Sequence, residues 1–384
     1  MDFEKKKQHG VRLFPSSHIS SVREAELRAT ASLLAMVRAV SEFGRALVRM
    51  AGGPAGKLTC YTEVEFELEG EKGKGPVKRR PDGIIRVVRG KTEWKALLEV
   101  KVGNDPLDQD QFDIYHLLSI AEKFDALITI SNQPAQLNGL PPLRVDGRRL
   151  RSVPVFHVSW ERLFSEAQML CRKKAIQNSD QKWMLDEWIR YIDDDGSQII
   201  AKPNLGKHWH DVLKSARTGD LHAASSYLED VVRHWDGFLK KAALQLRAKL
   251  GVEVQPKIPR SDRHDLDGRI KRIHSSAIKS GQLSGILKIP DAVGDIWIDV
   301  FLLAKTVRYR VVLDAPTDGR QATRVNWLLR QLRSLSNVPD DLVVTVQWDQ
   351  RGILSQGSLR DLVEDSSSLL RDTNKASIPK ECLP

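Results

Sequence analysis

The spacing of apolar residues divides the first 160 positions into a regular series of predicted elements. Residues 22–50 carry apolar side chains at the spacing of an amphipathic helix. Three predicted strands follow, at 58–68, 84–89 and 93–102. The last two are rich in branched apolar residues, as is typical of strands. A helical pattern that begins at Pro106 then precedes an apolar run at 125–131, which predicts a buried strand of a mixed sheet. The predicted order is helix, strand, strand, strand, helix, strand.

A two-residue turn sets the register between the second and third predicted strands. The turn is Gly90-Lys91, and a Gly-X pair favours a type II′ turn because its first position needs a positive φ. If Arg89 lies opposite Thr92, then Asp82 lies opposite Glu99. Opposed residues share a face of the sheet, with Cβ atoms roughly 4.5–5.5 Å apart. The pattern therefore predicts two carboxylates at one point on the sheet.

An ammonium group joins these carboxylates. Alternation along the strand places Lys101 on the same face as Glu99, while Leu98 and Val100 point to the opposite, apolar face. Hard divalent cations seek carboxylate oxygens, and a nearby lysine can hold an anionic substrate or an attacking water. Each feature alone has a plain structural interpretation, because Pro-Asp-Gly is a turn pattern and a Glu-x-Lys strand is often a solvated face. The shared register makes them one constellation.

The helix that follows adds two polar residues to the constellation. Asp105 is a favourable N-cap and Pro106 a favourable first helical residue. Gln111 and Tyr115 are four positions apart, so they are predicted to share one face of this helix.

These residues and this order of elements resemble the PD-(D/E)XK nuclease superfamily, in its RecB-like branch, over residues 20–160. Asp82 matches the family's first acid, and Glu99 and Lys101 match its (D/E)-x-K motif. The segment Gln111–Tyr115 matches its Q-x-x-x-Y helix motif. The resemblance implies a restriction-endonuclease-like α/β core, a mixed sheet flanked by helices. It also implies cleavage of phosphodiester bonds, usually in DNA, with Mg²⁺ as cofactor and Mn²⁺ as the alternative cation.

The family often takes one more acid from the helix before the first core strand. Glu26 lies two turns before Leu33 on the apolar stripe of the first predicted helix, whereas Glu24 falls on another side. A carboxylate on a core-facing stripe is costly unless it is hydrogen-bonded or binds metal, so Glu26 is the predicted third ligand. A buried, purely hydrogen-bonded role for Glu26 is the alternative. Glu63 and Glu65 share a face of the first strand and form either an exposed acidic edge or a further contact to the metal.

The second half of the chain has an α/β pattern of its own. We place the domain boundary at about residue 200, with a nuclease-like domain at 1–200 and an accessory α/β domain of unknown role at 201–384. Helices are predicted at 220–250 and 321–335, and strands at 286–289, 295–303, 309–314 and 341–348. The second domain is also the candidate surface for a homodimer or for a partner protein.

Composition is compatible with a polyanionic partner. The 384 residues carry a net charge of +10, and the excess is larger in residues 201–384 (29 basic, 22 acidic) than in residues 1–200 (31 basic, 28 acidic). A basic loop at 70–80 directly precedes Asp82. Three scattered cysteines predict neither a disulfide framework nor a zinc site and fit a reducing cytoplasm. A membrane-spanning role is not expected, because no apolar run of some 18 residues occurs.

Two functions from different classes remain. The first is a metal-dependent deoxyribonuclease with an accessory domain. The second is a non-catalytic nucleic-acid-binding or regulatory protein on a nuclease-like scaffold. The complete set of two acids, lysine and glutamine favours the first.

Overall fold

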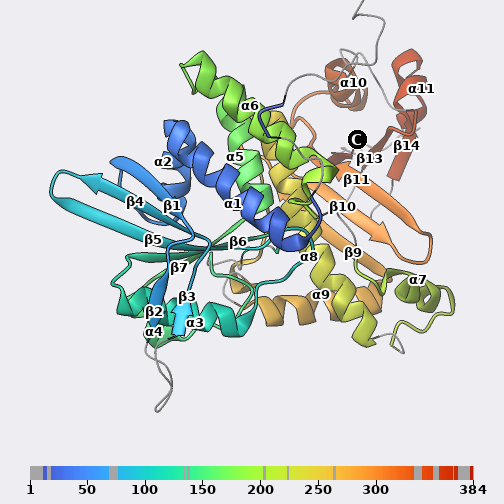
Figure 1. Cartoon of the computed structure of the whole chain (residues 1–384). Coiled ribbons are helices and arrows are strands. Elements are labelled where there is room, and N and C mark those ends of the chain that lie inside the picture. Colours follow the sequence, from blue (N-terminus) through green and yellow to red (C-terminus); the bar gives the residue numbers. More distant parts are fainter. Residues whose placement is uncertain are drawn as a thin grey trace, which may run out of the picture. The chain divides into compact units, whose positions relative to one another are not determined.

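The structure is a computed structural model of the whole chain (Figure 1). It describes residues 12–14, 19–68, 77–133, 135, 139–201, 205–222, 225–262, 265–332, 340–348, 354–365, 367–370 and 381–383.

The chain divides into two compact units that alternate along the sequence. The first unit comprises Met1–Gly206, Arg233–Val252 and Ile258–Lys271. The second comprises Lys207–Val232, Glu253–Lys257 and Arg272–Pro384. The first unit thus includes two segments that lie beyond residue 200.

The first unit is built on one five-stranded mixed sheet with the order β1-β4-β5-β6-β7. Its strands are β1 (Lys57–Thr62), β4 (Gly83–Arg89), β5 (Thr92–Val100), β6 (Ala126–Ser131) and β7 (Val155–Ser159). The pairs β1·β4 and β4·β5 are antiparallel, whereas β5·β6 and β6·β7 are parallel. Short strands β2 (Phe66–Leu68) and β3 (Val77–Arg79) form a separate ribbon. The predicted mixed α/β sheet flanked by helices is confirmed.

Helices cover both faces of this sheet (Figure 1). They are α1 (Val22–Ala39), α2 (Ser41–Met50), α3 (Gln109–Ala121), α4 (Gly147–Ser152), α5 (Trp160–Arg172) and α6 (Ser179–Asp193). Val100, one of the apolar residues of β5, belongs to the core formed with α1, α2, α5 and α6. Leu97 belongs to the core on the opposite face, formed with α3. Apolar burial on both faces therefore fixes the direction in which each β5 side chain points.

The β4–β5 hairpin has the predicted register. Arg89 is opposite Thr92, and the ladder runs without a bulge to Gly83 opposite Leu98. Gly90, the first turn residue, has φ +60°, a conformation that favours glycine. Because the register is continuous, Asp82 precedes the ladder at the position opposite Glu99.

Three predicted elements have other limits in the structure. The helix predicted at 22–50 is two helices, because the backbone of Val40 is extended. Gly44 then lets α2 approach α1: a Cβ on Gly44 would lie 2.2 Å from the carbonyl oxygen of Val37. The strand predicted at 58–68 is broken at Glu63, which has φ +54°. Part of the predicted loop 70–80 is strand β3.

The second unit contains two further sheets. One is antiparallel with the order β11-β10-β9-β8, and the other has the order β12-β15-β13-β14. Their strands are β8 (Gln255–Pro256), β9 (Gln282–Lys288), β10 (Ile296–Phe301), β11 (Thr306–Val311), β12 (Leu313–Asp314), β13 (Val343–Gln347), β14 (Leu354–Ser358) and β15 (Glu381–Leu383). The strand predicted at 309–314 is divided between the two sheets, because β11 ends at Val311 and β12 pairs with β15.

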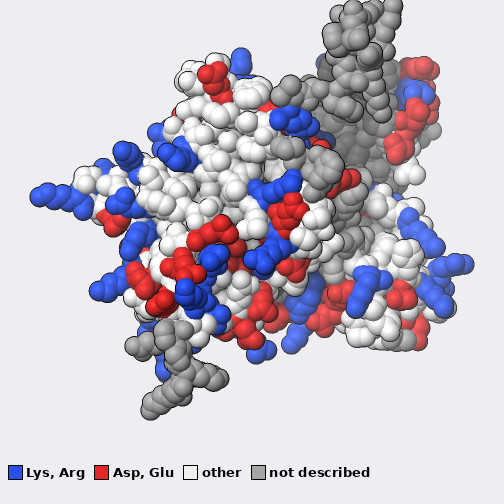
Figure 2. All heavy atoms as spheres, in the orientation of Figure 1, with Lys and Arg blue, Asp and Glu red and all other residues white. Residues whose placement is uncertain are grey.

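The remaining helices complete the chain. They are α7 (Trp209–Arg217), α8 (Ser225–Leu250), α9 (Leu266–Ser280), α10 (Gln321–Leu332), α11 (Leu359–Glu364) and the short 3₁₀ turns Asp195–Ser197, Arg260–Asp262 and Ser367–Leu369. Within the described part of the chain, none of the helices combines the length and the apolar character needed to cross a membrane. Basic and acidic side chains are interspersed over the face shown in Figure 2.

Candidate active site

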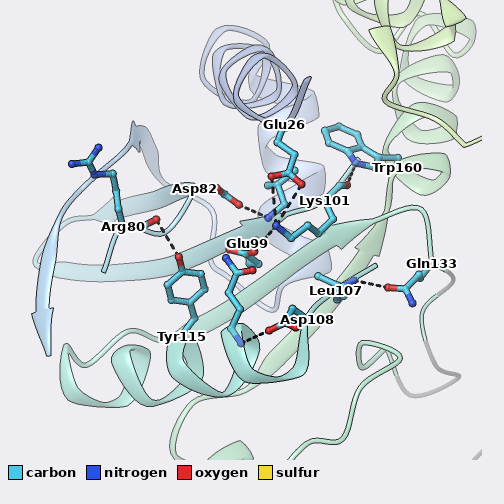
Figure 3. A network of polar contacts seen from close by, with 12 residues as sticks. Glu26, Arg80, Asp82, Glu99, Lys101, Leu107, Asp108, Tyr115, Gln133 and Trp160 are labelled. Atoms are coloured by element: carbon cyan, nitrogen blue, oxygen red, sulfur yellow. Dashed lines mark hydrogen bonds and ion pairs between the residues drawn. The ribbon is translucent and has the colours of Figure 1, made fainter. Parts of the chain in front are cut away.

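The predicted residues gather at the end of β5. Asp82 directly precedes β4, Glu99 lies near the end of β5, and Lys101 follows that strand. The backbone N–H of Lys101 donates to the carbonyl oxygen of Ile130 at 2.8 Å, so the parallel pairing with β6 extends to the lysine. Figure 3 shows Lys101 extending between Glu26 and Glu99.

Asp82 is anchored by the backbone of the neighbouring strand. Its Oδ2 accepts a hydrogen bond of 2.7 Å from the N–H of Val100. Burial raises the pKa of Asp82, against the opposing effects of the Val100 N–H and the Lys101 ammonium. Because the donor is a backbone N–H of β5, the contact holds one carboxylate oxygen in place without a flexible side chain.

Glu99 is the most buried acid of the group. The residue is 2% exposed, and both carboxylate oxygens are buried without a hydrogen-bond partner among the described residues. Burial and the negative charge of Asp82 raise the pKa of Glu99 well above its usual range. Ionised Asp82 and Glu99 have no hydrogen to donate to each other. The Glu99 carboxylate therefore needs either a proton or a cation beside it.

Lys101 is held between two of the carboxylates. Its Nζ lies 3.4 Å from Glu26 Oε1 and 3.5 Å from Glu99 Oε1, and its side chain is 13% exposed. Burial alone would lower the pKa of Lys101, but the charges of Glu99, Glu26 and Asp82 outweigh it and raise the pKa. The amine is therefore a permanent cation at neutral pH.

The two acids of α1 have different surroundings. Glu26 faces Lys101, and burial raises its pKa to about 7. Glu24 instead caps the start of the helix: its Oε2 accepts from the N–H and the hydroxyl of Ser20, and its Oε1 pairs with Arg28 at 2.6 Å. Of the two, the structure brings only Glu26 to Lys101.

Helix α3 braces the approach to Asp82. The Tyr115 hydroxyl donates to the carbonyl oxygen of Arg80 at 3.1 Å, two residues before the acid (Figure 3). Burial raises the pKa of Tyr115, and the side chain of Gln111, one turn earlier, opposes that rise. The N-cap of this helix is Asp108, which accepts from the N–H of Gln111 at 2.7 Å. The prediction of Asp105 as N-cap is wrong.

Glu65, one of the predicted outlying acids, has its partners away from the group. Glu65 forms ion pairs with Lys78 at 2.7 Å and Arg80 at 3.1 Å, so it is an exposed acidic edge that braces the β2–β3 ribbon. Glu63 lies at the break after β1. Lys72 and Lys74 of the predicted basic loop lie outside the described residues.

Sequence reasoning missed a tryptophan that holds Lys101. Trp160, fully buried at the start of α5, donates its indole N–H to the Lys101 carbonyl oxygen at 2.7 Å (Figure 3). The sequence signal for this contact was a tryptophan directly after a strand, because a buried indole N–H needs a hydrogen-bond acceptor. Its partner, 59 positions earlier, is set by the fold alone.

A polar row continues from Glu99 across the sheet. Thr129 on β6 is the register partner of Glu99, and His157 on β7 is the partner of Thr129. The Thr129 hydroxyl is 2.8 Å from His157 Nδ1, and His157 Nε2 is 2.8 Å from the Gln133 carbonyl oxygen. Burial lowers the pKa of His157 to about 4, so the ring is neutral at neutral pH. It is a structural hydrogen-bonding group.

The donor set suits a hard cation. Ionised Glu26, Asp82 and Glu99 bring three negative charges against the single charge of Lys101, so a divalent cation would balance the group. Oxygen-only carboxylate ligands are those that Mg²⁺ prefers. Among the described residues, however, no three His, Cys, Asp or Glu side chains are grouped closely enough to hold a metal ion by themselves. Asp82 and Glu99 are the two acids that could hold a cation together, because Lys101 Nζ lies between Glu99 and Glu26.

The chain matches no protein-family model, no curated protein and no solved structure. Function is therefore inferred from the residues and contacts described above.

Proposed function

We propose that this protein is a divalent-metal-dependent nuclease that hydrolyses phosphodiester bonds in DNA. The observation that carries the proposal is the pair of half-buried Asp82 and buried Glu99. Neither oxygen of Glu99 has a hydrogen-bond partner among the described residues, and the Lys101 ammonium lies 3.5 Å from Oε1. The sheet order and the helix on each face support a restriction-endonuclease-like core, the fold that the resemblance implies.

The residues divide the chemistry among them. Asp82 and Glu99 would hold Mg²⁺, with Glu26 as a supporting acid. A bound Mg²⁺ polarises the scissile phosphate and lowers the pKa of a water. Lys101 stays protonated, so it orients the attacking water or neutralises charge that grows on the phosphate oxygens.

Other contacts keep this group in place. Tyr115 restrains the backbone at Arg80, and the Val100 N–H restrains the Asp82 carboxylate. Trp160 restrains the backbone of Lys101 through its indole N–H. Preorganised charges are the largest contribution to many enzymatic rate enhancements, so these restraints matter to the rate.

Cleavage of linear, circular and single-stranded DNA, with and without Mg²⁺, tests the proposal. We expect metal-dependent cleavage that falls at least about 100-fold in Asp82→Asn and in Lys101→Ala, because each removes a charged group from the reacting centre. Asp110→Asn and Lys91→Ala are matched controls, since both side chains are exposed and lie on the neighbouring helix and turn. Cleavage by Lys101→Ala at the rate of the parent protein would refute the assignment.

A second function rests on the position of Lys101. Its ammonium already stands between Glu26 and Glu99, where it neutralises part of the acidic group without a metal. This arrangement favours a nucleic-acid-binding or regulatory protein without turnover. Binding of DNA without cleavage under every metal condition would select this alternative.

A further inference from the structure

The antiparallel sheet of the second unit has two unlike faces. On β9 and β10 one face is apolar and buried, with residues at most 5% exposed: Leu283, Leu287, Ile298 and Val300. On the edge strand β11 the same face continues in Val307 and Tyr309, which are exposed. The other face carries alternate residues of the edge strand β11 and of its neighbour β10. These residues are Trp297, Asp299, Phe301, Arg308 and Arg310, and they are placed on one face by the strand register.

Two arginines of β11 lie over two aromatic rings of β10. The Arg310 guanidinium carbon is 4.7 Å from the centroid of the Trp297 ring, and that of Arg308 is 5.1 Å from the Phe301 centroid. Trp297 and Phe301 are four residues apart on one strand, which separates them by about 13 Å. The face therefore presents two cation–ring pairs in a line along β10.

The charge on this face is positive. Lys288 on β9 and Arg308 on β11 are exposed, and the Arg310 side chain is 34% exposed. The one acid of the described face is Asp299, which is 4% exposed and accepts from Arg310 Nε at 3.1 Å. Three cations against one buried acid leave a net charge of +2 directed to solvent.

We propose that this face binds single-stranded DNA. Bases stack on aromatic rings and on guanidinium planes, and lysine and arginine neutralise the phosphates between them. An acidic protein would pair with the lysine and arginine charges but would leave the aromatic rings without stacking partners. A second copy of this face would bring cations against cations, so self-association is disfavoured. The choice of DNA rests on the proposed nuclease function, whereas binding by the face does not require cleavage.

Binding of a labelled oligothymidylate of about 16 nucleotides tests the charge component. The full chain carrying Lys101→Ala is used in EDTA, so that the probe stays intact. Lys288→Ala with Arg308→Ala should weaken binding about 20-fold at 0.1 M salt and reduce the slope of log affinity against log salt by about 1.4, because two phosphate contacts are lost. Lys214→Ala with Arg217→Ala is the control, since it removes two exposed charges from α7 of the same unit.

Phe301→Leu tests the stacking component. It keeps an apolar side chain under Arg308 but removes the ring, so affinity should fall about 5-fold or more with the salt slope unchanged. Unchanged thermal melting shows that the variant is folded. An unchanged affinity in a folded Phe301→Leu protein would overturn the stacking role.

Three further results would overturn the proposal. The first is an equal loss of affinity in the double variant and its α7 control. The second is that the double variant loses as much affinity for duplex DNA as for single-stranded DNA. The third is that polyglutamate or oligouridylate displaces the labelled probe more readily than unlabelled oligothymidylate does. Failure of the proposed nuclease function is seen separately. In that case the parent protein leaves DNA intact with Mg²⁺, while the Lys288 and Arg308 substitutions still weaken binding.

Discussion

At the scale of single residues, the site is a cluster of acids held in an unfavourable environment. Neither oxygen of Glu99 accepts a hydrogen bond from the described residues, although Lys101 Nζ lies 3.5 Å from Oε1. Burial also raises the pKa values of Asp82 and Glu26. Lys101 compensates only part of this negative charge. Active sites commonly store such electrostatic strain for a cation or a substrate to relieve.

The raised pKa of Glu26 predicts a pH-dependent stability of the metal-free protein. Burial raises the pKa of Glu26 to about 7, so the folded protein keeps this proton up to about pH 7, whereas the unfolded chain releases it near pH 4.5. The folded state therefore holds more protons in this window, and stability falls as pH rises through it. Between pH 5 and pH 8 the unfolding free energy of Glu26→Gln should fall by roughly 1–3 kcal/mol less than that of the parent protein. Urea denaturation in EDTA measures both.

Glu24→Gln is the control for this prediction. Hydrogen bonds from Ser20 lower the pKa of Glu24, so its contribution to stability has the opposite pH dependence. An identical pH profile for Glu26→Gln and the parent protein would show that Glu26 does not carry the raised pKa.

Trp160 is predicted to act as a positioning residue for Lys101. Trp160→Phe keeps most of the packing but loses the hydrogen bond to the Lys101 carbonyl, so unfolding free energy should fall by about 1 kcal/mol. If the lysine is misplaced, kcat should fall about 10-fold with little change in KM. Trp188→Phe is matched, because Trp188 is also fully buried and donates to Ser32 at 3.3 Å, away from the site. Equal kcat in the two variants would leave Trp160 a purely structural role.

At the scale of elements, the sequence predicted the features that depend on neighbouring residues alone. The two-residue turn at Gly90 fixed the hairpin register, and with it the pairing of Asp82 and Glu99. The break between α1 and α2 at Val40 depends on contacts between the two helices. The spacing of apolar residues along the sequence gives no information on such contacts. The start of α3 likewise depends on a distant residue, because the Leu107 N–H donates to Gln133 Oε1 at 3.0 Å.

The start of α3 gives a direct test. Asp108→Ala removes the N-cap hydrogen bond to Gln111, so unfolding free energy should fall by about 1 kcal/mol. Asp105→Ala is the comparison, since Asp105 lies ahead of the helix and should have a smaller effect in chemical denaturation. A larger loss in Asp105→Ala than in Asp108→Ala would contradict the observed cap.

At the scale of the whole molecule, the sequence indicated two α/β regions but not their alternation along the chain. The segment Arg233–Val252 of α8 belongs to the first unit. There Arg247 pairs with Glu166 at 2.6 Å, and Lys241 pairs with Glu161. The amphipathic pattern of α8 predicted a helix, but periodicity alone does not say which core a helix joins.

The Arg247–Glu166 pair predicts that α8 is needed for the stability of the first unit. Arg247→Met leaves the buried Glu166 carboxylate with the longer contact to Arg162, at 3.9 Å, and should cost about 3 kcal/mol of unfolding free energy. Adding Glu166→Gln should recover part of that loss in the same denaturation measurement. Lys249→Met, an exposed position on the same helix, is the control. A cost no larger than that of the control would mean that the pair contributes little.

Titration of the protein with Mn²⁺, followed by electron paramagnetic resonance, most directly tests whether the β4–β5 hairpin holds a catalytic cation. The parent protein should bind Mn²⁺ in competition with Mg²⁺, and Asp82→Asn and Glu99→Gln should each weaken binding by at least about 10-fold. Asp110→Asn should bind as the parent does. Undiminished Mn²⁺ binding in a protein that lacks both carboxylates would contradict the account.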